Sequence, residues 1–177
     1  MKPVKRIAMS GIGTALGVLC LMAVVYLPTM NVAFSFLAGA CVTLSFLADF
    51  RSWGWSLLSF FAAATLAVVL TGNVVELLPF CVFFGPFAWL KLLVDEKIPV
   101  RAVRWVLKFV WVNLSLVAMY FLFRTFLLNA EEFEAFVRQY WWLTLLVVNL
   151  LTVPYDYFLR ETNAFLKKYL AKFFNRP

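Results

Sequence analysis

The ionisable side chains that could bind a ligand in this sequence lie near the ends of long apolar runs. The four residues that flank Glu76 are all Val or Leu, and a carboxylate in such surroundings normally faces a cavity or a charged partner. Arg124 lies near the end of another apolar run, at a depth comparable to that of Glu76. The two side chains could form an ion pair, reach separately to the membrane interface, or contact a bound solute.

Aromatic and amide side chains occur at the same level as Glu76 and Arg124. They are Tyr26, Asn31, Asn73, Tyr120 and Trp141. A pocket for a flat organic ligand needs aromatic walls, a few amides and one or two charges, so these seven residues form the candidate ligand-binding site. Aromatic residues also anchor helices at membrane interfaces, which is the alternative for Trp141. Asn31, Asn73 and Glu76 are therefore the better candidates for ligand contacts.

Several kinds of chemistry are disfavoured by what the sequence lacks. It contains no His, which removes the commonest general base and metal ligand. Cys20, Cys41 and Cys81 lie in apolar runs, with spacing typical of neither a disulfide framework nor a zinc site. No glycine-rich phosphate-binding motif is present. We therefore expect no catalytic residues, no metal site, no cofactor and no ATP hydrolysis by this chain itself.

The elements that must position these residues follow from the composition. Of the 177 residues, 64% are hydrophobic and 14% are charged, whereas soluble domains are about half apolar and a quarter charged. A membrane-spanning helix needs about 20 apolar residues. The apolar runs cover residues 7–27, 32–48, 53–70, 74–94, 103–128 and 139–159. The sequence thus predicts an all-α integral membrane protein whose single domain, residues 1–177, has six transmembrane helices.

The distribution of positive charge predicts the orientation of these spans. All 16 Lys and Arg residues except Arg124 and Arg138 fall on the side that holds both termini. Cytoplasmic loops are enriched in Lys and Arg, so we expect a multi-pass protein of the cell membrane with both termini cytoplasmic. This explains the net charge of +7 without nucleic acid as a partner. The basic amphipathic tail, residues 160–177, is expected to contact anionic membrane lipids.

Polar residues and helix breakers inside the runs have structural interpretations. Asn113 and Asn149 fall near the middle of the fifth and sixth runs, where a buried amide must form hydrogen bonds, most simply with another helix. Asp156 could cap a helix or pair with Lys91 or Lys108. Pro79 and the pair Gly85–Pro86 interrupt the fourth run, which should be kinked or partly unwound.

Two strips of small residues mark the first apolar run. Gly11 and Ala15 are four residues apart, and so are Gly13 and Gly17. Small residues at this spacing let another helix backbone approach closely. The approaching helix could belong to the same chain or to a second membrane protein.

The segment Lys5-Arg6-Ile7-Ala8, the strip through Gly11 and Ala15, and six short spans in 177 residues together resemble an S component of energy-coupling factor (ECF) transporters. That resemblance implies an Ala-x-x-x-Ala contact with a transmembrane coupling subunit, at Gly11 and Ala15 here, with Gly in place of the first Ala. It also implies that a vitamin-like micronutrient or precursor binds under the outer loops. The S component would then tip over in the membrane to release it when partner ATPases act.

Two other classes stay open at this stage. Small six-span scaffolds of cell-envelope assembly, similar to the rod-shape membrane subunit MreD, have comparable length and topology. An aliphatic outer cavity would favour that class, whereas a polar pocket around Asn31, Asn73 and Glu76 would favour solute binding. A stand-alone ion-coupled transporter, with Glu76 as its proton site, is least favoured because the sequence shows neither inverted halves nor a midplane acidic residue.

Overall fold

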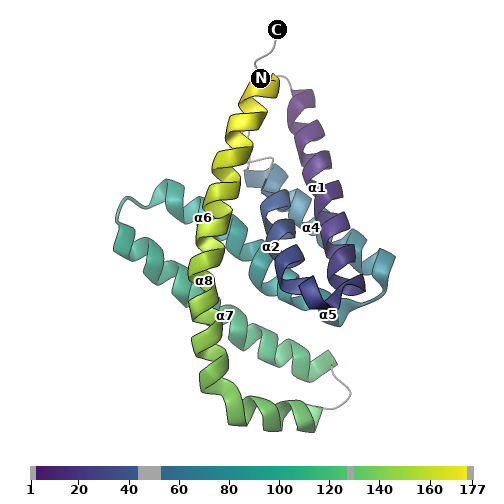
Figure 1. Cartoon of the computed structure of the whole chain (residues 1–177), viewed down its shortest axis with the longest axis vertical. Helices are drawn as coiled ribbons and strands as arrows, with labels where there is room; N and C mark the ends of the chain where they lie inside the picture. Colours follow the sequence, from purple (N-terminus) through teal and green to yellow (C-terminus); the bar gives the residue numbers. More distant parts are fainter. Residues whose placement is uncertain (1–2, 44–52, 127–129, 175–177) are drawn as a thin grey trace.

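The computed structural model of this chain describes residues 3–43, 53–126 and 130–174, and within these ranges every regular element is a helix. The elements are α1 (Pro3–Tyr26), η1 (Pro28–Met30), α2 (Asn31–Val42), α4 (Trp53–Thr71), α5 (Val74–Pro79), η2 (Phe80–Phe84), α6 (Gly85–Lys97), α7 (Arg101–Phe126) and α8 (Ala130–Phe174). Figure 1 shows their arrangement. The predicted all-α class is confirmed for the described residues.

Five helical stretches in the described ranges are long and apolar enough to cross a membrane. They are Ile7–Tyr26, Gly54–Thr71, Val74–Lys97, Arg101–Thr125 and Val137–Phe165. Their bounds agree with five of the runs predicted from the sequence. The remaining run, 32–48, corresponds to α2, which has only 12 residues and a length of about 18 Å. The hydrocarbon core is about 30 Å thick, and residues 44–48 lie outside the described ranges.

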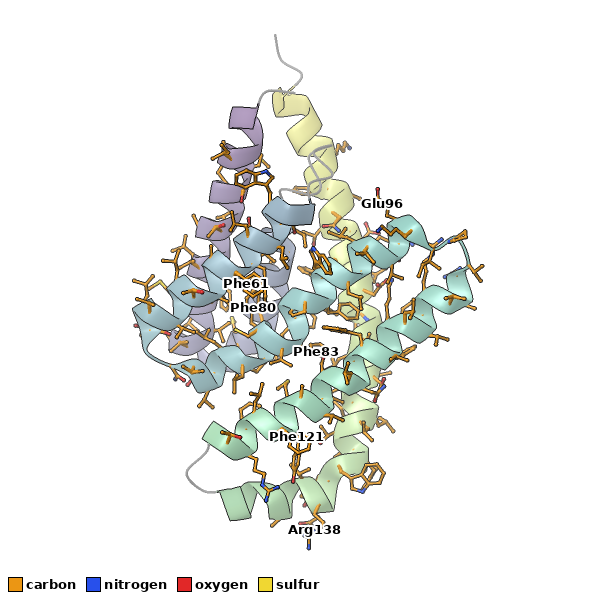
Figure 2. The ribbon with its side chains drawn as sticks, turned by 180° about the vertical axis from the view of Figure 1, so that it is seen from behind. Phe61, Phe80, Phe83, Glu96, Phe121 and Arg138 are labelled. Carbon is orange, nitrogen blue, oxygen red and sulfur yellow. The ribbon has the colours of Figure 1, made fainter. Side chains whose placement is uncertain are left out.

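Helices α1, α2, α4 and α5 form the first part of the molecule, around a core that includes Leu21, Val24, Ala63 and Phe80. Figure 2 shows Phe80 within this bundle. Gly17 faces the same core, where a methyl group in its place would lie 3.4 Å from the Cβ of Ala63. The absence of a side chain at Gly17 therefore allows α1 and α4 to pack closely.

The helix of the fourth apolar run changes its type in the region where Pro79 and Gly85–Pro86 predicted a distortion. Helix α5 ends at Pro79, the five residues of η2 form a π-helix, and Pro86 lies in the first turn of α6. Each proline removes a backbone donor, and the π-helical turn widens the helix between the two prolines. The run stays helical throughout, so it is distorted rather than unwound.

A second core joins the π-helical segment to α2, α6, α7 and α8. Tyr155 of α8 lies at its centre and is fully buried. The rings of Phe36, Phe84 and Phe87 surround Tyr155 with centroid distances of 4.3 to 5.3 Å. This aromatic packing fixes the middle of α8 against the rest of the chain.

Helix α8 is longer than predicted. It runs for 45 residues without a break at Pro154, which corresponds to about 68 Å. The sequence predicted a span ending at residue 159 and a separate tail from 160; instead, one helix continues to Phe174. Figure 1 shows that this end of α8 and the start of α1 lie at the same end of the molecule. Arg138 lies at the opposite end (Figure 2).

Candidate functional site

A groove of about 530 Å³ lies between the C-terminal half of α7 and the first half of α8. Its lining residues are Asn113, Leu116, Val117, Met119, Tyr120, Phe121, Phe123, Val137, Trp141, Thr144 and Leu145. In Figure 2, Phe121 lies between these two helices. Figure 1 shows that the C-terminal end of α7 and the start of α8 extend beyond the rest of the chain.

The lining of this groove is apolar and rich in rings. Tyr120, Phe121, Phe123 and Trp141 provide aromatic surface, and none of the lining residues carries a charge at neutral pH. Binding sites for small molecules typically measure about 300 to 1,000 Å³ and combine apolar walls with a few polar groups. The groove therefore has the size and the surface to hold one small organic molecule.

A pair of amides lies at one part of the groove wall. Asn113 of α7 and Asn149 of α8 each donate to the other's side-chain oxygen at 3.3 Å. Each also donates to a main-chain oxygen one turn earlier, at 2.7 Å for Asn113 and 2.8 Å for Asn149. The prediction that these central amides form hydrogen bonds with another helix is confirmed, and the partner of each is the other amide. Asn113 is the member of the pair that lines the groove.

The seven residues of the predicted ligand site lie in two places. Tyr120 and Trp141 line the groove, and Arg124 lies one turn beyond Tyr120 on α7 with an exposed side chain. Tyr26, Asn31, Asn73 and Glu76 instead lie at the ends of α1, α2 and α5, and none of these four lines the groove.

Within the second group, Asn73 has a defined structural role. Its side-chain oxygen accepts a hydrogen bond of 3.2 Å from the main-chain N–H of Glu76 and caps α5. The side chain of Glu76 is exposed. The ion pairs of Lys91 and Lys108 with Asp95 and Asp156 form another cluster, and Glu76 does not belong to it.

Several groove residues were missed by the sequence analysis. They include Leu116, Phe123, Thr144 and Leu145. Asn113, Leu116, Tyr120 and Phe123 recur at helical spacing, which places them on one face of α7. An aromatic and polar stripe of this kind, matched by a second stripe on α8, is the signal that could have located the groove.

A buried charge cluster joins α6, α7 and α8. Lys91 contacts Asp95 at 3.0 Å and Asp156 at 2.9 Å, and Lys108 contacts the same two carboxylates at 2.9 and 2.7 Å. Both lysines are 3% exposed. The predicted pairing of Asp156 is confirmed, and it includes both lysines. Because two positive and two negative charges meet, the cluster is formally neutral and holds three helices together.

The two strips of small residues on α1 have different surroundings. Gly13 and Gly17 are buried, whereas Gly11 and Ala15 are exposed. A methyl group at Gly11 would have no heavy atom within 4 Å. The strip of Gly13 and Gly17 is thus used in packing within the chain. The strip of Gly11 and Ala15 remains open on the surface.

The described residues show no arrangement suited to a metal ion: they contain no group of three or more His, Cys, Asp or Glu side chains that could hold one. Cys20, Cys41 and Cys81 are free thiols. Comparisons of the chain with protein-family models, with curated proteins and with solved structures find no match.

Proposed function

We propose that this chain is the substrate-binding S component of an ECF-type importer and captures a vitamin-like micronutrient or precursor. The observation that carries this proposal is the groove of about 530 Å³ between α7 and α8, with its four aromatic side chains and few polar groups. Such a lining suits a flat organic molecule rather than an ion. Tyr120 and Trp141 are the proposed ligand contacts.

In this proposal the protein has six spans in the cell membrane and both termini in the cytoplasm. Two observations support it: the start of α1 and the end of α8 lie at one end of the molecule, and Arg138 lies at the other. The predominance of Lys and Arg on the terminal side agrees with the rule for cytoplasmic segments. Tyr26, Asn31, Asn73, Glu76 and Arg124 would lie toward the outer face and meet the solute before it reaches the groove.

The proposed partners are a transmembrane coupling subunit and ATPase subunits, which would dock at Gly11 and Ala15. Both residues are exposed on α1, and the open space above Gly11 admits another helix backbone. Since this chain has no phosphate-binding loop, the ATPases would supply the energy for release.

The test is native mass spectrometry of the protein purified gently from its host, with two sets of variants. Trp141→Ala should reduce the retained small molecule and leave the complex with the partner subunits intact. The double variant Gly11→Leu and Ala15→Leu should lose the complex with the partner subunits and keep the small molecule. Ile12→Leu is the matched control, because Ile12 is 52% exposed on the same helix and should change neither.

Two outcomes would contradict the proposal. If the partner complex survived the double variant, docking would not occur at Gly11 and Ala15. If wild-type protein carried no small molecule and no ATPase subunits, solute capture itself would be wrong. Glu76→Gln tests the outer residues separately, since unchanged affinity for the solute would remove Glu76 from its path.

The second candidate function is a membrane scaffold of the cell envelope. The observation that favours it is the large apolar surface of α7 and α8, where residues such as Val110, Leu114 and Leu150 are more than half exposed. The same purification distinguishes the two functions. A scaffold would copurify with envelope-assembly proteins and without a small molecule.

A further inference from the structure

Two of the three cysteines meet between consecutive helices. Cys20 belongs to α1 and Cys41 to α2, and their side chains form a hydrogen bond with each other. Both are free thiols, and both are partly buried. The sequence places them in separate apolar runs, whereas the fold brings their sulfur atoms together.

The packing of α1 against α2 accounts for this contact, and Figure 1 shows the two helices side by side. Gly17 lies one turn before Cys20 on α1. A methyl group in place of Gly17 would lie 3.5 Å from Cγ1 of Val42, which directly follows Cys41. Since Gly17 carries no side chain, the two helices approach closely at this level. A disulfide needs two Cα atoms within about 7 Å of each other, and close helix packing favours such a separation.

The third cysteine provides a comparison within the same chain. Cys81 lies in η2, and like the other two it is a partly buried free thiol. Among the described residues, which include all three cysteines, the hydrogen bond between thiols joins Cys20 to Cys41 and does not include Cys81. The chain therefore has one pair of thiols and one single thiol.

We propose that Cys20 and Cys41 form a modification site, at which an organic hydroperoxide dissolved in the membrane oxidises the two thiols to a disulfide. This inference goes beyond the proposed solute capture and does not depend on it. Cys20 lies in the stretch Ile7–Tyr26, which is long and apolar enough to span a membrane. An oxidant must therefore dissolve in lipid to reach the pair, and a neutral hydroperoxide does so.

The reaction has two steps. One thiol sulfur attacks an oxygen of the hydroperoxide, the O–O bond breaks, and the organic part takes up the thiol proton and leaves as an alcohol. The resulting sulfenic acid condenses with the neighbouring thiol, so that an S–S bond forms and one water molecule leaves. In sum, the two sulfur atoms lose two electrons, which the hydroperoxide gains.

The hydrogen bond between the thiols gives this pair an advantage over Cys81. Attack on the peroxide develops negative charge on the first sulfur, and a hydrogen bond from the second thiol stabilises that charge. The second thiol is then already beside the sulfenic acid. We expect the pair to react about tenfold faster than Cys81, since one hydrogen bond has an effect of this order.

The test treats the full chain in lipid nanodiscs with cumene hydroperoxide and then alkylates the remaining thiols with N-ethylmaleimide in denaturing detergent. Mass spectrometry should show that the number of alkylated thiols falls from three to one, with the peptides of Cys20 and Cys41 joined. The oxidised protein should melt at a higher temperature than the reduced protein, because a disulfide restricts the unfolded chain. A phosphine reductant should reverse both changes.

Single variants connect the reaction with the pair. Cys20→Ala and Cys41→Ala should each form no disulfide within the chain, and the remaining member of the pair should react as slowly as Cys81. Cys81→Ala is the matched control, because it also removes one thiol but should form the disulfide at the rate of the wild type.

Three outcomes would overturn the proposal. The first is loss of all three thiols at equal rates. The second is oxidation without a peptide that joins Cys20 to Cys41. The third is a lower melting temperature of the oxidised protein, which would show that α1 and α2 do not accept the bond without strain. Peptide mapping of the wild-type protein decides the matter even if a cysteine variant fails to fold.

Discussion

Tyr155 donates a hydrogen bond of 2.8 Å to the main-chain oxygen of Phe84. Phe84 is the last residue of the π-helical segment, which lies between Pro79 and Pro86. A helix distorted in this way has carbonyl groups whose regular partners are displaced, and in a membrane these groups need other donors. The phenol of α8 supplies one such donor and connects the distorted segment to the longest helix of the chain.

Replacing Tyr155 with Phe should lower the free energy of unfolding by about 1–3 kcal/mol, because a buried carbonyl loses its partner. Gly39→Ala should also destabilise, since the new methyl group would overlap the hydroxyl of Tyr155. The double variant should lower the free energy of unfolding by less than the sum of the two single variants, because Tyr155→Phe removes the hydroxyl that the new methyl group would overlap. Reversible unfolding in mixed micelles measures all three. Strictly additive costs would show that Gly39 and Tyr155 are not coupled.

Gly85 should tolerate no side chain. A methyl group there would overlap the ring of Phe60, and overpacking of a core costs typically about 1–3 kcal/mol. Gly54→Ala is the matched control, because Gly54 is also helical and has no heavy atom within 4 Å of the position of a new methyl group. We expect a lowered melting temperature in detergent for Gly85→Ala only. An equal decrease in both variants would point to a general effect of replacing helical glycines.

In the charge cluster, a second substitution that restores the balance of charge should recover stability lost through the first. Asp156→Asn leaves Lys91 and Lys108 to share Asp95, and an uncompensated buried charge costs about 3–5 kcal/mol. Adding Lys108→Met restores neutrality, since Lys91 and Asp95 remain paired at 3.0 Å. The double variant should therefore be more stable than Asp156→Asn alone, as measured by unfolding in mixed micelles. If Lys108→Met lowered stability further in this background, the balance of charge would not govern the cluster.

The sequence predicted these polar contacts better than it predicted the groove. A buried carboxylate such as Asp156 needs a cation, and Lys91 and Lys108 were suitable partners at a similar depth. The position of a residue along a span gives its depth in the membrane, but it does not give its place within the plane of the membrane. For this reason the sequence grouped Glu76 and Arg124 in one site. In the structure Glu76 does not line the groove. The sequence placed Pro154 inside the sixth run, as the structure has it, but it did not predict that the same helix continues to Phe174. Charged residues from Arg160 onward end an apolar run without ending a helix. Groove formation depends on which helix faces remain uncovered, and composition alone does not determine that.

The amide pair between α7 and α8 gives the last prediction. Asn113→Leu would leave Asn149 without the oxygen to which it donates at 3.3 Å, so a buried polar group would lose a partner. Replacing both residues with Leu removes the polar side chains together and gives apolar surfaces of similar size. The double variant should thus unfold with a free energy closer to that of the wild type than Asn113→Leu does, by about 1 kcal/mol. A double variant that is less stable than either single variant would mean that the two amides contribute to stability through contacts other than their mutual hydrogen bonds.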